Sequence, residues 1–172
     1  MPFDDQTEMF WWVDEMDREL GSITRAEAHS GSKKFHRAVD ILVFNTKDQL
    51  LMQKRSMKKD VSPGYWTISV SGHVTYPQSY LETAVKETGE EIGLTLQPEN
   101  FIEKGDLKII YAKECEISKL YKVNLNHAVE IHFDPIEIDA VEWVDKNKLS
   151  EWIQTHPITL AAREVLSYSK LI

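Results

Sequence analysis

Residues 72–94 read GHVTYPQSYLETAVKETGEEIGL, and this stretch predicts the architecture around which the rest of the chain folds. Ser79 and Glu82 have the spacing of a capping box, in which each side chain binds a free backbone amide at the start of a helix. We predict a helix from about Ser79 to Ile92, ended by Gly93, which can adopt the left-handed conformation of a helix terminus. Residues expected to face the core recur at spacings of three or four: Leu81, Ala84, Val85, Thr88 and Ile92.

The other side of this predicted helix carries Glu87, Glu90 and Glu91, whose spacing places three carboxylates on one surface. Such like-charged pairs each destabilise a helix by roughly a few tenths of a kcal/mol, and Gly89 costs roughly 1 kcal/mol relative to alanine. A divalent cation would convert the repulsion into coordination, because Mg²⁺ and Mn²⁺ prefer hard oxygen ligands. The alternative is that the three glutamates form only a solvated face, as charge runs usually do.

The composition limits the class of protein and its partners. A chain of 172 residues without a repeat or a Pro/Gly/Ser-rich linker is expected to form a single domain, residues 1–172. The net charge of -8 argues against binding to nucleic acid or an anionic membrane, although local cations can still bind a small anion. Met1–Phe10 does not resemble a signal peptide and no segment is apolar enough to span a bilayer, so a soluble, cytoplasmic protein is expected. The single cysteine, Cys115, is consistent with a reducing compartment.

Strand-like and helix-like segments interleave along the chain, which indicates one mixed α/β domain. The predicted strands are Phe10–Asp14, Ala38–Phe44, Gln49–Lys54, Tyr65–Val70, Leu107–Ala112, Glu116–Leu125, Val129–Phe133 and Ala140–Val144. The second and third of these are expected to form a β-hairpin. Asp17–Lys34 is predicted to be a polar loop, and two further helices are predicted at Lys146–Trp152 and Thr159–Tyr168.

Residues 72–94 resemble the Nudix box: Gly, five residues, Glu, seven residues, then Arg-Glu-U-x-Glu-Glu-x-Gly-U, where U is apolar. The spacing is kept, and the matching residues are Gly72, Glu87, Glu90, Glu91, Gly93 and Leu94. Gln78 replaces the first Glu, Lys86 the Arg and Thr88 an apolar residue, so the usual Glu–Arg pair could survive only as a hydrogen bond. The resemblance implies an α/β (α+β) fold, an α/β/α sandwich with a mixed β-sheet. It also implies catalytic metal ions, Mg²⁺ or Mn²⁺, that bind a substrate diphosphate and are held by Glu87, Glu90 and Glu91.

Over most of its length, the chain also resembles the Nudix branch that contains type 1 isopentenyl-diphosphate isomerases. The motifs that carry it are Ala28-His29, Phe35-His36-Arg37-Ala38, Gln53-Lys54-Arg55, Pro63-Gly64-Tyr65-Trp66-Thr67, Ser69-Val70-Ser71-Gly72-His73 and Glu114-Cys115-Glu116. The positions that match the isomerases' metal ligands are His29, His36, His73, Glu114 and Glu116. Such mixed ligation suits Mn²⁺, Fe²⁺ or Zn²⁺. The positions that match their diphosphate-binding cations are Arg25, Arg55 and Lys59, although each alone could be a surface cation.

Two positions differ from the isomerases. Ser71 stands where they have the catalytic cysteine, and Ile158 aligns with their active-site tryptophan. A serine hydroxyl is a far weaker acid than a thiol, whereas Glu87 and Glu90 restore carboxylates that bacterial isomerases tend to lack. We therefore predict a metal-dependent pyrophosphohydrolase that cleaves a diphosphate linkage in a nucleoside- or isoprenoid-type substrate.

Two alternatives remain open at this stage. The first is an isomerase-like protein that uses the five-ligand metal site. The second is a catalytically silent diphosphate-binding module, which Gln78 and Lys86 would favour. The residues also leave open whether His73 binds metal or substrate, which glutamate is the base, and whether exposed sheet edges pair in a homodimer.

Overall fold

The computed structural model describes residues 4–111 and 113–172; residues 1–3 of the predicted domain and Ala112, at the end of a predicted strand, lie outside them. The described strands belong to one sheet. In chain order they are β1 (Met9–Val13), β2 (Glu19–Thr24), β3 (Phe35–Phe44), β4 (Gln49–Arg55), β5 (Trp66–Thr67), β6 (Val70–His73), β7 (Ile102–Ile110), β8 (Cys115–Asn124) and β9 (Ile138–Asp145). The helices are α1 (Arg25–Ala28), α2 (Tyr80–Ile92), α3 (Leu149–Trp152) and α4 (Leu160–Tyr168), with 3-10 turns η1 (Pro98–Asn100) and η2 (Lys146–Lys148).

Helix α2 forms where the capping box predicts it. The Ser79 hydroxyl accepts a hydrogen bond from the Glu82 amide at 3.3 Å, and the Glu82 carboxylate accepts one from the Ser79 amide at 2.8 Å. Gly93 ends the helix with a φ of 70°, and a Cβ there would lie 2.6 Å from the carbonyl oxygen of His132. The residues predicted to face the core are buried or pack against it: Leu81, Ala84, Val85, Thr88 and Ile92.

Strand β3 lies at the centre of a mixed sheet. It runs parallel to β8, with Phe35 opposite Cys115 and Phe44 opposite Asn124, and antiparallel to β1 and β6. The predicted hairpin of β3 with β4 is confirmed, but its register contains one pair, Phe44 with Leu50. Strand β4 then pairs with β5 and β9. The sheet therefore opens between β3 and β4 toward the end of the molecule where β6 lies.

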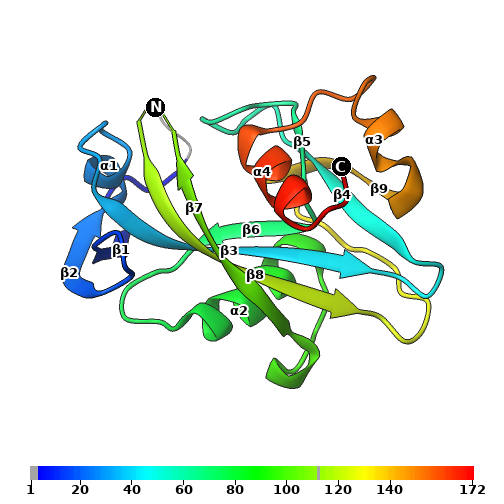
Figure 1. Ribbon diagram of the computed structural model, residues 1–172, viewed down its shortest axis with the longest axis horizontal. Coiled ribbons are helices and arrows are strands. Elements are labelled where there is room, and N and C mark those ends of the chain that lie inside the picture. The colour runs from blue at the N-terminus through cyan, green and yellow to red at the C-terminus, as the bar shows by residue number, and fades with distance from the viewer. Residues whose placement is uncertain (1–3, 112) are drawn as a thin grey trace.

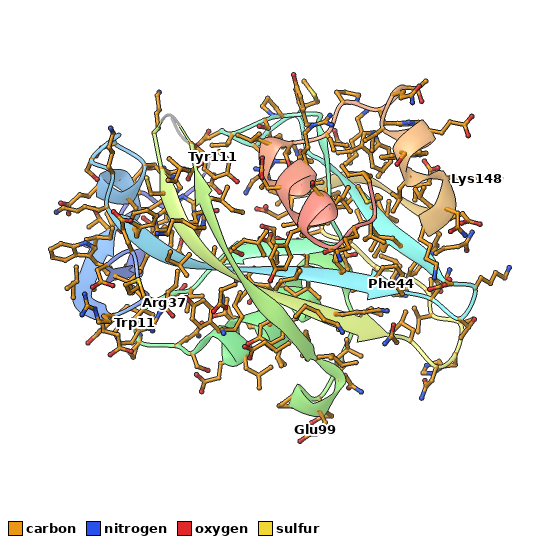
Figure 2. The ribbon with its side chains drawn as sticks, viewed as in Figure 1. Trp11, Arg37, Phe44, Glu99, Tyr111 and Lys148 are labelled. Atoms are coloured by element: carbon orange, nitrogen blue, oxygen red, sulfur yellow. The ribbon has the colours of Figure 1, made fainter. Side chains whose placement is uncertain are left out.

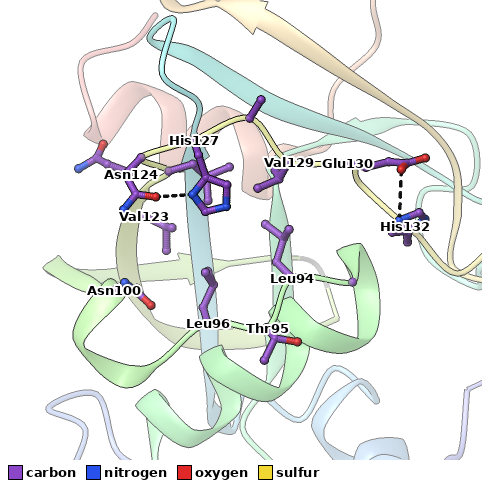
Figure 3. A pocket seen from close by; sticks show the side chains of 14 residues that line it. Leu94, Thr95, Leu96, Asn100, Val123, Asn124, His127, Val129, Glu130 and His132 are labelled. Atoms are coloured by element: carbon purple, nitrogen blue, oxygen red, sulfur yellow. Dashed lines mark hydrogen bonds and ion pairs between the residues drawn. The ribbon is translucent and has the colours of Figure 1, made fainter.

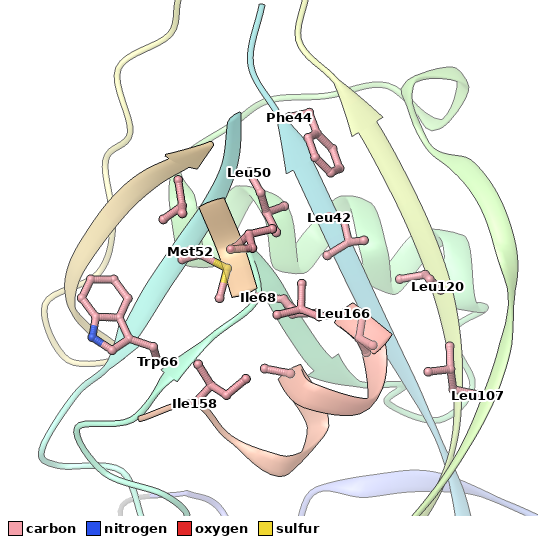
Figure 4. Close-up of a cluster of buried hydrophobic side chains, with 14 of the residues drawn as sticks. Leu42, Phe44, Leu50, Met52, Trp66, Ile68, Leu107, Leu120, Ile158 and Leu166 are labelled. Atoms are coloured by element: carbon pink, nitrogen blue, oxygen red, sulfur yellow. The ribbon is translucent and has the colours of Figure 1, made fainter. Parts of the chain in front are cut away.

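The two faces of the sheet carry separate hydrophobic cores, because consecutive residues of β3 point to opposite sides. Ile41 and Val43 belong to the core that α2 covers. Leu42 and Phe44 belong to the core that packs against α4 (Figure 4). Helices α2 and α4 accordingly lie on opposite sides of β3 in Figure 1. The predicted α/β/α sandwich with a mixed sheet is confirmed.

The predicted single strand Tyr65–Val70 is wrong, because this segment is divided into β5 and β6. The Ser69 hydroxyl lies between them and replaces part of the missing backbone ladder. It accepts a hydrogen bond from the Val43 amide at 2.8 Å and donates one to the Leu51 carbonyl at 2.7 Å. A buried side chain thus bridges the opening between β3 and β4.

Two other expectations about the elements are also wrong. Asp17–Lys34 is not one loop, because it contains β2 and α1, whose start is capped by Thr24. Val129–Phe133 contains no strand; its apolar side chains pack against the α2 core without backbone pairing. Within residues 4–111 and 113–172, no helix combines the length and apolar character needed to cross a membrane.

Candidate metal and diphosphate site

Strand β6 distributes consecutive side chains to opposite faces of the sheet. Ser71 and His73 lie on the face that α4 covers, whereas Gly72 lies on the face that α2 covers. A Cβ at Gly72 would lie 2.8 Å from the Cγ of Glu87. Glycine therefore lets a carboxylate of α2 approach the strand backbone.

Of the three helix carboxylates, Glu87 and Glu91 lie against the sheet. Gln53 on β4 donates a hydrogen bond to Glu91 at 2.7 Å. The Glu90 side chain is 60% exposed and lies 3.4 Å from Lys86, which is also 3.4 Å from Glu87. The structure thus brings Glu87 and Glu91 to the sheet and leaves Glu90 at the rim, joined to Glu87 through Lys86.

The two inner carboxylates are incompletely compensated. Burial, followed by the charge of Glu87, raises the pKa of Glu91 to about 8. Burial also raises the pKa of Glu87, although Lys86 opposes the shift. Among the described residues, the Gln53 amide is the one hydrogen-bond donor to the Glu91 carboxylate. Buried carboxylates whose charges repel are suited to receive a cation.

A second cluster contains the predicted isomerase-type ligands. One potential ligand atom from each of His29, His36, His73 and Glu114 lies within 4.8 Å of the others. An oxygen of Glu116 is 3.2 Å from the Nε2 of His73 and 3.8 Å from that of His36. The parallel pairing of β3 with β8 places His36 opposite Glu116, so the sheet itself aligns part of this set.

The protonation of this cluster is set by burial and by mutual contacts. Burial lowers the pKa of His73 to about 3 and that of His36 well below its usual value. Burial, followed by the charge of Glu114, raises the pKa of Glu116 to about 8. Burial opposes ionisation of Glu114, but its 2.9 Å contact with His29 outweighs this and lowers its pKa. Burial thus favours the neutral forms of both His73 and Glu116, which are 3.2 Å apart.

This donor set fits a divalent metal ion. Both ring nitrogens of His36 are buried and have no hydrogen-bond partner within the described part of the chain. Neutral imidazole is the form of histidine that binds metal, and its combination with carboxylates suits Mn²⁺, Fe²⁺ or Zn²⁺. The Phe10 ring stacks on His36 and His73 at centroid distances of 5.5 and 4.6 Å, which restricts both imidazoles.

The predicted substrate-binding cations surround the carboxylate of Asp4. Arg25 begins α1, Arg55 ends β4, and Lys59 lies in the loop that follows. Asp4 is 3.3 Å from Arg25 and 2.9 Å from Lys59. Arg55 acts electrostatically on both Asp4 and Glu91. The cations therefore lie beside the helix carboxylates.

Glu8 connects the cations with both acidic clusters. Its carboxylate is 3.2 Å from Arg25 and accepts a hydrogen bond from Thr75 at 2.9 Å. Its charge contributes to the pKa of Glu87 on one side and to that of His73 on the other. The two clusters and the cations thus form one continuous charged region around β6.

Sequence reasoning overlooked two residues beside the histidine cluster. Asp40 is buried opposite Ser71 and accepts a hydrogen bond from Ser118 at 2.6 Å; burial raises its pKa to about 7. Tyr111 follows β7, and burial together with the charge of Glu116 raises the pKa of its hydroxyl (Figure 2). Asp40 could have been identified from sequence as the one acidic residue within the apolar run of β3. No sequence pattern pointed to Tyr111.

Gln78 and Lys86 do not form the pair that the Nudix box usually contains. No hydrogen bond joins Gln78 to Lys86 among the residues that the structure describes. Instead, Trp11 donates from its indole nitrogen to the Gln78 carbonyl at 2.7 Å, and Arg37 covers its ring at 5.0 Å (Figure 2). Trp11 thus holds the loop before α2. Ile158 is buried in the α4 core.

A pocket lies at the C-terminal end of α2 (Figure 3). Its lining includes Leu94, Leu96, His127 and Val129. It contains none of the site residues predicted from sequence, and we assign it no role. The charged region around β6 is therefore the candidate site.

The fold and this charged region define a Nudix-type domain. Residues 34–168 match the family model of the NUDIX domain, and the chain belongs to this family. Family members typically use divalent metals.

Two relatives and one solved structure extend this result. The chain is 40% identical over 87 residues to an uncharacterised Nudix hydrolase of Pseudomonas aeruginosa, a match that covers 51% of each chain. It is 28% identical over 145 residues to an isopentenyl-diphosphate Delta-isomerase of Haloarcula marismortui, covering 81% of this chain and 77% of the isomerase. A crystal structure of a Deinococcus radiodurans protein superimposes with a TM-score of 0.76 at 20% identity, covering 93% of this chain and 98% of that one, which shows a shared fold.

Proposed function

We propose that the protein is a pyrophosphohydrolase that uses Mg²⁺ or Mn²⁺ to cleave the diphosphate linkage of a nucleoside- or isoprenoid-type substrate. The observation that carries this proposal is the pair Glu87 and Glu91, two partly buried carboxylates held against the sheet with little compensation. Family membership supports the hydrolase class. The neighbouring cations supply what a diphosphate requires.

Each group of residues has a distinct task in the proposed reaction. Glu87 and Glu91 would hold the ions against the sheet, and Glu90 would contribute a weaker contact from the rim; the ions when bound supply positive charge against the phosphoryl oxygens. The diphosphate would be oriented by the three cations predicted from sequence, Arg25, Arg55 and Lys59. Water attacks phosphorus as the bond to the bridging oxygen breaks, and one helix glutamate accepts the proton of the water. Each product then carries one phosphoryl group of the original linkage.

The deciding experiment measures phosphate release from a panel of nucleoside, sugar and isoprenoid diphosphates with Mg²⁺ or Mn²⁺. Glu91→Gln should lower turnover by about a hundredfold to a thousandfold while the fold is retained. Glu99→Gln is the matched control, because Glu99 is an exposed glutamate in η1 that belongs to neither acidic cluster. Near-normal turnover of Glu91→Gln would refute the assignment.

A second candidate function is isomerisation of an isoprenoid diphosphate. The observation that favours it is the assembled cluster of His29, His36, His73 and Glu114, with Glu116 beside it. Ser71 argues against it, because a hydroxyl does not readily exchange protons with carbon. Resemblance to isomerases over most of the chain supports retaining this candidate.

Incubation with isopentenyl diphosphate separates the candidates by NMR, since isomerisation moves a double bond and releases no phosphate. Ser71→Cys is the sharpest variant, because it restores the acid that the isomerases use. Double-bond migration in the wild type would favour isomerisation. If the wild type and Ser71→Cys both bind diphosphates but form no product with any metal, a catalytically silent binding module is favoured instead.

A further inference from the structure

Asp4 is a partly buried anion inside the cationic part of the proposed site. One of its carboxylate oxygens is 3.3 Å from a guanidinium nitrogen of Arg25, and the other is 2.9 Å from the ammonium nitrogen of Lys59. The three side chains are only 10–13% exposed. Burial opposes ionisation of Asp4, but Lys59, Arg25 and then Arg55 outweigh it and lower the pKa. A carboxylate that bridges two cations in this way has the charge and geometry expected of a bound phosphoryl group.

We propose that Asp4 is a built-in competitor, which occupies the anion pocket of Arg25, Arg55 and Lys59 and leaves when a diphosphate binds. The inference rests on the proposed function for the identity of the pocket. The inference adds Asp4 as a residue that determines the affinity of this pocket for anions and its selectivity among them.

Release of Asp4 leaves neither contacting cation without a partner. Arg25 retains Glu8 at 3.2 Å, and Lys59 retains Glu137 at 2.7 Å. A diphosphate offers more oxygens and more negative charge than one carboxylate, so the exchange strengthens the ionic contacts. The departure of Asp4 therefore does not require a buried charge to become unpaired, which would be expensive.

The chain around Asp4 also permits this exchange. Backbone contacts to α1 begin just after it: the Gln6 carbonyl accepts from the Ala26 amide at 3.1 Å, and the Glu8 carbonyl accepts from the Arg25 amide at 2.8 Å. These hydrogen bonds fix the segment that leads into β1. Asp4 can thus turn away from the pocket without disturbing the sheet.

The test measures binding of inorganic pyrophosphate by isothermal titration calorimetry in EDTA, where neither metal cluster contributes. Asp4→Asn removes the competing charge and should tighten binding about tenfold or more. Asp5→Asn is the matched control: it makes the same change in net charge at the neighbouring position, where the carboxylate accepts hydrogen bonds from Thr7 and interacts with Arg25 only electrostatically. Asp4→Ser provides a second neutral variant in case the asparagine retains a contact with Lys59.

The outcomes separate the inference from the proposed function. Equal or weaker pyrophosphate binding in both Asp4 variants would overturn the inference, whether or not the wild type hydrolyses diphosphates. Tighter binding that Arg25→Gln abolishes in the Asp4→Asn background would support it. If Asp4→Asn binds pyrophosphate more tightly but the wild type hydrolyses no diphosphate, the role of Asp4 as a competitor is supported and the hydrolase assignment fails.

Discussion

The two faces of β6 carry acidic clusters that differ in composition and in exposure. On the α2 face, Glu87 and Glu91 offer only oxygen ligands, and Glu90 reaches solvent. On the other face, His73 belongs to a partly buried cluster of imidazoles and carboxylates, in which His36 is fully buried. Oxygen ligands suit Mg²⁺, whereas mixed nitrogen and oxygen ligands suit transition metals. The clusters on the two faces of β6 therefore favour different ions. The difference teaches that resemblance to hydrolases and resemblance to isomerases have separate physical locations in this chain.

The largest effect is expected from Glu87→Gln, which removes a partly buried carboxylate from the α2 face. If this face carries hydrolysis, turnover should fall by about a hundredfold or more in assays with Mg²⁺. Glu90→Gln should lower it by less than about tenfold, because Glu90 lies at the rim and is held by Lys86. Comparison of kcat for the two variants measures the contrast directly. The reverse order would show that Glu90 enters the site during turnover.

The next effect concerns metal binding on the histidine face. At about one hundred times Kd, Mn²⁺ or Zn²⁺ should raise the melting temperature of the wild type by about 5–10 °C, because the ion binds only the folded state. His36→Gln should lose most of this rise. His127→Gln is the control, since that histidine is exposed and remote from the cluster. The melting temperature is measured by scanning fluorimetry. If the metal raises it as much in His36→Gln as in the wild type, the metal does not bind at this cluster.

A smaller effect should follow from Gly72→Ala, which tests the contact between β6 and α2. The added Cβ would lie 2.8 Å from the Cγ of Glu87 and displace that side chain. Turnover should fall about tenfold, as expected for a misplaced catalytic group, while the histidine cluster on the other face retains its metal-induced shift. Loss of both properties together would mean that the two faces do not act separately.

The smallest effect is expected from Gly89→Ala, also on α2. Gly89 is exposed, and a Cβ there would lie 3.9 Å from the Leu94 carbonyl oxygen, which is ordinary van der Waals contact. Alanine should stabilise the helix by about 1 kcal/mol and raise the melting temperature by about 2–4 °C. Turnover should change little. A large loss of turnover would indicate that the helix must deform at this glycine during the reaction.

The predictable parts of the fold are those with local causes. Ser79, Glu82 and Gly93 identify the ends of α2 because caps depend on residues close in sequence. Val129–Phe133 misled because its apolar pattern reports burial and not backbone pairing. The division of Tyr65–Val70 depends on the Ser69 hydroxyl meeting two distant strands, a contact that no local pattern reveals.

The candidate site divides in the same way. Spacing alone indicated the carboxylates of α2, whereas the histidine cluster was identified only through resemblance, since its members come from separate elements. Asp4 and Asp40 were not foreseen. Their environments depend on Lys59 in one case and Ser118 in the other, residues distant in sequence that only the tertiary fold brings near.

The alternation along β6 has a consequence for how this chain can change. Substitution at Ser71 or His73 alters one face, but insertion or deletion of a single residue would rotate every later side chain of the strand to the opposite side. A histidine would then be forced against α2, and the opening for Glu87 would be lost at the same moment. The length of this short strand is therefore under a stricter constraint than its composition.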